Sequence, residues 1–334
     1  MNQATLDRLF GVTSAFDHPV TVGITIGVVG ALVAAAPLMA IVFRWRQVEQ
    51  PQREELWKRY RSWLVLAPLM FVPVLIGAAT TIAAIAVLSI LCYREFARAT
   101  GLFREKMMSA TVVVGMLFIT FAVADHWYGF FMALGPLGVS VIAAVAILAD
   151  RPKGYIQRVA LGTWGFLLFG VGLGHLGYMA NDVDYRPLIL TILVCVEAND
   201  IFAYLAGKSI GHRKLVPNTS PNKTLGGALG AVLLTTALYA LLGHFLFEGS
   251  VLASPVHLMG LGLIISVAGQ LGDLMLSSIK RDLGIKDMGV TLPGHGGLLD
   301  RFDSLILVAP AVYHYVAYFR GFGLDQEIRI ITGG

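Results

Sequence analysis

The chain has 334 residues, of which 56% are hydrophobic and 14% are charged, and its mean hydropathy is +0.72. A soluble globular domain is usually about one quarter charged, so this composition excludes an ordinary soluble protein and favours a polytopic membrane protein. The formal net charge is only +4, and we expect the lipid bilayer, and no nucleic acid, to be a partner.

Apolar segments close to the length that spans a bilayer recur along the chain. In chain order they lie near residues 20–43, 64–78, 80–96, 108–124, 129–149, 159–179, 188–206, 224–246, 257–279 and 302–319. The second and third are either one long tilted helix over 64–96 or a tight hairpin that breaks around Gly77. The predicted fold is therefore all-α, a polytopic integral membrane bundle of about nine to ten transmembrane helices.

The distribution of Lys and Arg decides between a long helix and a hairpin. Six of the 25 basic residues lie in 44–62 and four in 94–106, and the segments 150–158, 207–223 and 280–301 carry three, four and four. If these segments face the cytosol, an even number of spans must separate the first two, which favours the hairpin. Ten spans with both termini outside follow, and nine spans with one re-entrant or short segment are the alternative. We expect the bacterial cytoplasmic membrane as the location.

Three carboxylates fall inside predicted spans: Glu197, Asp200 and Asp273. A charge at mid-bilayer costs at least about 2.5–3.5 kcal/mol on insertion scales, and such residues usually serve a partner, an ion or a water-filled cavity. Glu197 and Asp200 are three residues apart and share one helix face. Ion pairs buried between helices are the plainer interpretation, and it stays open here.

The stretch from Lys280 to Ser304, KRDLGIKDMGVTLPGHGGLLDRFDS, is unusually polar for such an apolar chain. Its carboxylates at 287, 300 and 303 suit a hard divalent cation such as Mg²⁺, which binds oxygen ligands and shares its shell with phosphates. The basic residues at 280, 281, 286 and 301 interleave with them. A cation together with basic groups is what a nucleoside triphosphate and a lipid phosphate need.

The run from Pro293 to Gly297 precedes the last predicted span. Gly296 and Gly297 allow backbone N–H groups to approach an anion closely, ahead of a helix N-terminus. His295 is a candidate hydrogen-bond donor to phosphate. A general-base role for His295 is open but not required, because a phosphate monoester is already an anionic nucleophile.

The same stretch closely resembles the signature of the phosphatidate cytidylyltransferase family. That pattern is Ser-x-x-Lys-Arg, then Lys-Asp, then Pro-Gly-His-Gly-Gly, then Asp-Arg-x-Asp. Here it is filled by Ser277 or Ser278, Lys280, Arg281, Lys286, Asp287, Pro293 to Gly297, Asp300, Arg301 and Asp303. Asp273 lies in the Gly-Asp pair that precedes it.

An earlier segment is similar to a second family pattern, Asp-x-x-Ala-Tyr-x-x-Gly followed by Ser-Pro-x-Lys-Thr. The matching residues are Asp200, Ala203, Tyr204, Gly207, Ser220, Pro221, Lys223 and Thr224. The family usually continues with Trp-Glu-Gly, whereas this chain has Leu225-Gly226-Gly227. This departure weakens any glutamate role at position 226 and is compatible with a divergent branch that prefers another lipid.

The resemblance implies a reaction of CTP with phosphatidate that yields CDP-diacylglycerol and pyrophosphate, with magnesium as cofactor and a second cation left open. It implies catalytic roles for Asp287, Asp300, Asp303, His295 and Lys280. It implies metal binding by Asp273, Asp287, Asp300 and Asp303. The residues expected at the phosphates or at the nucleotide or lipid entrance are Lys223, Ser220, Arg281, Lys286, Arg301, Gly296, Gly297, Asp200 and Tyr204.

The resemblance also divides the chain. Residues 1–150 would be anchoring helices with contacts in a homodimer, since members are often dimeric, and residues 151–334 would be a catalytic region with its site facing the cytosol. Three alternatives are left open: an ion-coupled transporter that uses the intramembrane acids, a cytidylyltransferase for a different lipid phosphate, and a degenerate homologue with a regulatory or scaffolding role.

Overall fold

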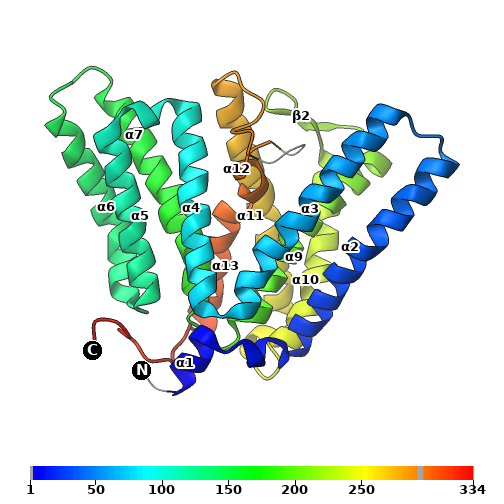
Figure 1. Cartoon of the computed structure of the whole chain (residues 1–334), viewed down its shortest axis with the longest axis horizontal. Coiled ribbons are helices and arrows are strands. Elements are labelled where there is room, and N and C mark those ends of the chain that lie inside the picture. The colour runs from blue at the N-terminus through cyan, green and yellow to red at the C-terminus, as the bar shows by residue number, and fades with distance from the viewer. Residues whose placement is uncertain (1–2, 292–295, 334) are drawn as a thin grey trace.

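The computed structural model describes residues 3–291 and 296–333 of the chain. Within them it has ten helices that are long and apolar enough to cross a membrane, and almost no β structure (Figure 1). The predicted helical membrane bundle is confirmed, with ten segments of spanning length. His295 and the start of its glycine run, residues 292–295, lie outside the described residues.

The helices that make up the ten spans follow the predicted segments in order. They are α2 (Pro19–Trp45), α3 (Gln50–Ile76), α4 (Ala78–Thr100), α5 (Lys106–Ala124), α6 (Tyr128–Leu148), α7 (Tyr155–Gly165), α8 (Leu173–Met179), α9 (Tyr185–Ile210), α10 (Leu225–Leu246), α11 (Pro255–Asp282), α12 (Leu299–Phe302) and α13 (Leu305–Phe319). A π-helical stretch, η3 (Phe166–Gly172), joins α7 to α8 in a single span, and α12 and α13 together make the last span.

Shorter elements complete the chain. They are α1 (Gln3–Phe10), the 3₁₀ turns η1 (Val12–Phe16), η2 (Leu102–Arg104) and η4 (Val251–Ala253), and the strands β1 (Lys214–Val216) and β2 (Ser220–Thr224). The two strands pair antiparallel, with Lys214 opposite Thr224. This small hairpin was not predicted, and it sits in the basic loop between α9 and α10.

The hairpin around Gly77 is confirmed, because α3 ends at Ile76 and α4 begins at Ala78. Hydroxyl groups hold the turn together: Thr80 Oγ1 donates to the Pro73 carbonyl at 2.7 Å, and Thr81 Oγ1 donates to the Gly77 carbonyl at 2.7 Å. Both carbonyls also accept backbone N–H groups, from Gly77 and Thr81 respectively, so the hydroxyl groups reinforce the turn.

Helix α3 starts well before the predicted apolar segment at 64. Its added turns are charged and reach beyond the apolar part, where Arg59 pairs with Glu55 one turn earlier at 2.5 Å. Such i,i+4 pairs support a helix in water. Hydropathy therefore located the membrane-embedded part of α3 and missed its polar extension.

Both chain termini lie at one end of the bundle, and the β hairpin and α12 lie at the opposite end (Figure 1). The connections α2–α3, α4–α5, α6–α7, α9–α10 and α11–α12 also belong to that opposite end. They are the segments that hold most of the Lys and Arg residues. This end is called the basic end below.

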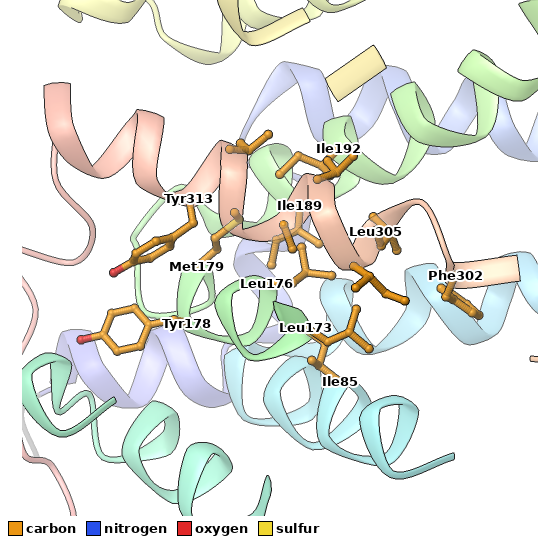
Figure 2. Close-up of a cluster of buried hydrophobic side chains, with 14 of the residues drawn as sticks. Ile85, Leu173, Leu176, Tyr178, Met179, Ile189, Ile192, Phe302, Leu305 and Tyr313 are labelled. Atoms are coloured by element: carbon orange, nitrogen blue, oxygen red, sulfur yellow. The ribbon is translucent and has the colours of Figure 1, made fainter. Parts of the chain in front are cut away.

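A core of buried apolar side chains joins helices from both halves of the chain (Figure 2). Ile85 of α4 lies beside Leu173 and Leu176 of α8, with Ile189 of α9 and Leu305 of α13 close by. Each of these contacts removes apolar area from the surroundings and adds close packing. The division at residue 150 stays a prediction. Helix α4 of the first part packs directly against α8 of the second.

Candidate active site at the basic end

The signature stretch is organised around Asp300, on the short helix α12. Its Oδ1 lies 2.8 Å from Lys280 Nζ at the end of α11, and the two side chains are 5% and 11% exposed. Its Oδ2 accepts the N–H groups of Met288 and Gly297, each at 2.9 Å. One carboxylate thus closes the loop between α11 and α12, and hydrogen bonds to a charged group are the strong kind.

A second ion pair links the β hairpin to α11. Lys223 of β2 contacts Asp273, and each side chain is about one quarter exposed. Asp273 also accepts the hydroxyl of Ser277 at 3.2 Å. This pair brings together the two signature segments, which are separate in sequence.

Three helices deliver further acids to the same region. Asp200 of α9, Asp273 of α11 and Asp303 at the end of α12 lie within electrostatic reach of one another. Asp303 is buried, and one of its oxygens accepts the Ser304 N–H at 2.7 Å. Arg301 is close enough to Asp200 and Glu197 to attract both. A cluster of acids with interspersed cations is a setting for phosphate or metal chemistry.

Beside these charges opens a cavity of about 1290 Å³. Its apolar wall comes from α2, α3 and α9 and includes Val28, Leu32, Met70, Phe71 and Leu193. Its charged part includes Glu197, Asp200, Lys286, Asp287 and Arg301, and Arg59 and Glu55 of α3 extend it. One chamber therefore offers an apolar surface and a charged surface to the same ligand, which is the requirement for a lipid with a phosphate headgroup.

The remaining candidates occupy the margin of this region. Tyr204 lines the cavity and is 66% exposed. Ser220 begins β2, and Arg281 Nε donates to the Thr219 carbonyl at 3.2 Å, so it braces the β hairpin. Gly296 has a φ of +81°, a conformation that favours glycine.

Glu95 of α4 was not among the predicted site residues, yet it contacts both flanks of the signature loop. It accepts the Thr291 hydroxyl at 2.5 Å and the N–H groups of Leu298 and Leu299 at 3.0 and 2.8 Å. Its side chain is buried. The available sequence signal was a lone acid at the end of the span at 80–96, between Arg94 and Arg98.

The Leu225-Gly226-Gly227 departure coincides with a close helix crossing. A Cβ atom on Gly226 would lie 2.7 Å from the Ile210 carbonyl oxygen, and one on Gly227 would lie 2.6 Å from the Ala203 carbonyl oxygen. These are backbone atoms of α9, which have little freedom to move. A glutamate at position 226 does not fit this arrangement of α9 and α10.

The acids of this region are candidate ligands for a cation. Over residues 3–291 and 296–333, no three His, Cys, Asp or Glu side chains are close enough to ligate one ion together. The oxygens of Asp300 are engaged by Lys280 and two N–H groups, whereas Asp200, Asp273 and Asp303 influence one another electrostatically. An excess of carboxylates beside a cavity suits a hard cation better than it suits a soft metal ion.

The fold and the site define an integral membrane protein with a charged, cavity-facing centre at one end of a helical bundle. Residues 57–319 match the model of the family described as the cytidylyltransferase family. The match covers most of the chain, so the protein belongs to this family and is a nucleotidyltransferase.

The chain is also similar to individual proteins of known sequence. An uncharacterized protein of Escherichia coli (strain K12), YnbB, is 32% identical over 295 residues, which cover 86% of this chain and 96% of that protein. The phosphatidate cytidylyltransferase of Bacillus subtilis (strain 168) is 34% identical over 221 residues, 64% of this chain and 81% of that enzyme. The phosphatidate cytidylyltransferase of Staphylococcus aureus (strain COL) is 41% identical over 141 residues, 42% of this chain and 53% of that enzyme.

Proposed function

We propose that this protein transfers the cytidylyl group of CTP to phosphatidate or a related lipid phosphate, giving a CDP-lipid and pyrophosphate. One observation carries the proposal: the signature loop with its Lys280–Asp300 pair stands beside a cavity that is apolar along α2, α3 and α9 and charged near Lys286 and Arg301. The names of the Bacillus subtilis and Staphylococcus aureus relatives support phosphatidate as the acceptor.

The reaction needs little covalent chemistry from the protein. A phosphate oxygen of the lipid attacks the α-phosphorus of CTP and forms a phosphoanhydride bond. The bond from the α-phosphorus to its bridging oxygen breaks, and its electrons leave with pyrophosphate. Lys286 and Arg301 line the cavity and would neutralise phosphate charge there, while Lys223 and Lys280 are held at their acidic partners nearby.

Magnesium is proposed as the cofactor, and the number of cations is open. Asp273 and Asp303 would offer oxygens to it, with phosphate oxygens of the substrate as further ligands, while Asp287 faces the cavity and Asp300 acts mainly through the loop that it closes. When bound, a divalent cation would neutralise phosphate oxygens and favour departure of pyrophosphate. The roles of His295, Ser220, Tyr204, Arg281, Gly296 and Gly297 stay predictions, as does a homodimer.

The acceptor is the least constrained part of the proposal. The Leu225-Gly226-Gly227 departure and the broad match to the uncharacterized YnbB both leave room for another lipid phosphate. The family assignment sets the transporter alternative aside. The concentration of Lys and Arg at the basic end supports a site on the cytosolic side of the bacterial cytoplasmic membrane, where CTP is available.

The test is a direct assay of the purified protein in lipid nanodiscs. Labelled CTP and magnesium are supplied with phosphatidate or one of a panel of other lipid phosphates, and CDP-lipid and pyrophosphate are followed in parallel. We expect both products in equal amounts, and a loss of at least about 10²-fold in Asp303→Asn. Product from no acceptor would refute cytidylyl transfer, and product from a different acceptor alone would correct the substrate.

A further inference from the structure

We propose that Glu95 is a positioning residue of the active site, which holds the two described flanks of the signature loop, residues 288–291 and 296–299, in their working conformation. This inference rests on the proposed cytidylyl transfer. Glu95 is not part of the signature, because it lies on α4, about 200 residues earlier in the chain. The structure brings it to the loop.

The contacts of Glu95 involve both of its oxygens. Oε1 accepts the Thr291 hydroxyl at 2.5 Å and the Leu298 N–H at 3.0 Å, and Oε2 accepts the Leu299 N–H at 2.8 Å. Thr291 lies before the glycine run and Leu298 and Leu299 lie after it. One side chain therefore fixes the distance between the two flanks.

Glu95 accepts N–H groups at the start of a helix. Residues 298 and 299 begin the last span, and the first N–H groups of a helix lack intrahelical acceptors. Glu95 and Leu299 are both buried, so water does not readily replace the carboxylate. Leaving a buried donor unsatisfied costs about 1–3 kcal/mol.

Glu95 and Asp300 accept successive backbone N–H groups of the loop. Asp300 accepts the Gly297 N–H, and Glu95 accepts the next two N–H groups along the chain. Asp300 is also the partner of Lys280. A shift of the loop away from α4 would therefore move the Lys280–Asp300 pair and the nearby wall of the cavity together. Misplacement by about 1 Å can cost roughly 10²-fold in rate.

A substitution at Gly289 would disturb the same contact from the opposite side. The three nearest atoms to a Cβ at Gly289 all belong to Glu95: Oε1 at 2.7 Å, Cδ at 2.8 Å and Cγ at 3.2 Å. The φ of Gly289 is not among the positive ones, so alanine is compatible with its backbone. Gly289→Ala therefore acts mainly by displacing the Glu95 carboxylate from its three donors.

The experiment compares Glu95→Ala, Glu95→Gln and Gly289→Ala with wild type in the nanodisc assay. Glu105→Gln is the matched control, since Glu105 pairs with exposed Arg151 at 2.7 Å. We expect Glu95→Ala to lower kcat about 10²-fold with a much smaller change in KM for CTP. Glu95→Gln keeps one acceptor oxygen and should recover part of that loss, and Glu105→Gln should match wild type.

The double variant Glu95→Ala/Gly289→Ala separates positioning from general damage. Alanine at 289 finds space once the carboxylate is gone, so the double variant should be no slower than Glu95→Ala alone. Effects on kcat that multiply, or a kcat unchanged in Glu95→Ala, would overturn the proposal. If Glu95→Ala does not fold, the kcat of Glu95→Gln and Gly289→Ala decides, and wild-type values in both would refute it.

Amide hydrogen exchange provides a readout that does not depend on the substrate. Glu95→Ala should raise exchange at Leu298 and Leu299 at least about tenfold, because each loses its acceptor. Glu105→Gln should leave both amides unchanged. Faster exchange in a protein whose wild type forms no CDP-lipid would refute the proposed function and keep the anchoring role. Unchanged exchange with an active wild type would refute the role of Glu95 alone.

Discussion

Lys280 and Asp300 illustrate how a chain tolerates two nearly buried charges at the edge of a membrane. Each neutralises the other at 2.8 Å, and Asp300 has two backbone N–H donors in addition. Removing one partner of such a pair leaves an uncompensated buried charge, which costs about 3–5 kcal/mol, whereas removing both can be nearly neutral.

Lys280→Met should therefore lower the free energy of unfolding by about 3–5 kcal/mol. Lys280→Met/Asp300→Asn should be less destabilised than the sum of the single variants, since neither lone charge remains. Unfolding in one detergent, followed by tryptophan fluorescence, measures both. Arg151→Met, which removes an exposed partner of Glu105, is the control and should cost under about 1 kcal/mol. Strict additivity of the two changes would contradict this account of the pair.

At the scale of elements, the crossing of α9 and α10 depends on the absence of side chains at Gly226 and Gly227. The opposing atoms are backbone carbonyl oxygens of Ile210 and Ala203. Because interiors are closely packed, a methyl group here forces the two helices apart instead of being absorbed by a side-chain rotation.

Gly227→Ala should destabilise the protein by about 1–3 kcal/mol and lower activity, since the α9–α10 connection carries Lys223. Gly27→Ala on α2 is the matched control, because a Cβ there meets no atom within 4 Å. Alanine in a helix interior is favoured over glycine by up to about 1 kcal/mol, so the control should be neutral or stabilising. Thermal unfolding of both variants makes the comparison. Equal effects would mean that the crossing is not the cause.

The tail after α13 folds back onto the turn between α5 and α6. Asp125 accepts the N–H groups of Ile331 and Thr332 at 2.6 and 3.0 Å, and the Thr332 hydroxyl at 2.7 Å. His126 Nδ1 lies 3.0 Å from the Glu327 carbonyl oxygen. Burial acts to raise the pKa of Asp125, but the hydrogen bonds from Thr332 and Ile331 outweigh it and hold that pKa below its ordinary value. Burial lowers the pKa of His126.

Docking of the tail should weaken in two steps as pH falls. A free histidine takes up a proton near pH 6.5 while docked His126 resists it, so the first loss begins there. Asp125 contributes stability above the free-carboxylate pKa of about 3.9, and this contribution is lost as pH falls through its lower docked value. Amide exchange at Ile331 and Thr332 between pH 7 and 3, corrected for intrinsic rates, measures both steps. Asp125→Asn should abolish the lower step only, and an unchanged lower step would contradict the assignment.

At the scale of the whole molecule, the bundle separates two chemically different ends. The basic end carries the ion pairs, the acids and the charged part of the cavity, and the opposite end carries both termini and the docked tail. Helices of both halves meet along the core of α4, α8, α9 and α13 (Figure 2), so the loop anchored by Glu95 rests on a packed scaffold.

The distribution of basic residues predicts that the two ends face opposite sides of the membrane. Cysteine reporters at Lys153 and Glu248, both exposed and on opposite ends, test this. In spheroplasts, an impermeant maleimide should label Glu248→Cys directly and Lys153→Cys only after lysis. The native Cys92 and Cys195 are fully buried, so the unaltered protein serves as an unlabelled control. The reverse labelling pattern would invert the orientation.

The ten spans and the break at Gly77 followed from the sequence alone. Lipid cannot satisfy backbone hydrogen bonds, so each apolar segment must be helical, and the basic residues limit how the segments connect. The charged stretch at 280–304 was also recognisable from the sequence, because an apolar chain keeps such residues only where they have partners. The polar extension of α3 and the β hairpin were missed, since both lie where hydropathy carries no signal.

Only the tertiary structure decided which charges meet. The sequence contained Lys223, Asp273, Lys280 and Asp300, but their pairing depends on how α9, α10, α11 and α12 pack. Glu95 reaches Leu298 across 203 positions of chain, and α2 and α3 supply the apolar wall of a cavity whose charged part comes from α9 and the signature loop. Such contacts are set by packing between distant segments, which local hydropathy and spacing do not encode. The sequence determined where the membrane spans and the chemical groups lie along the chain, and the fold determined which of them act together.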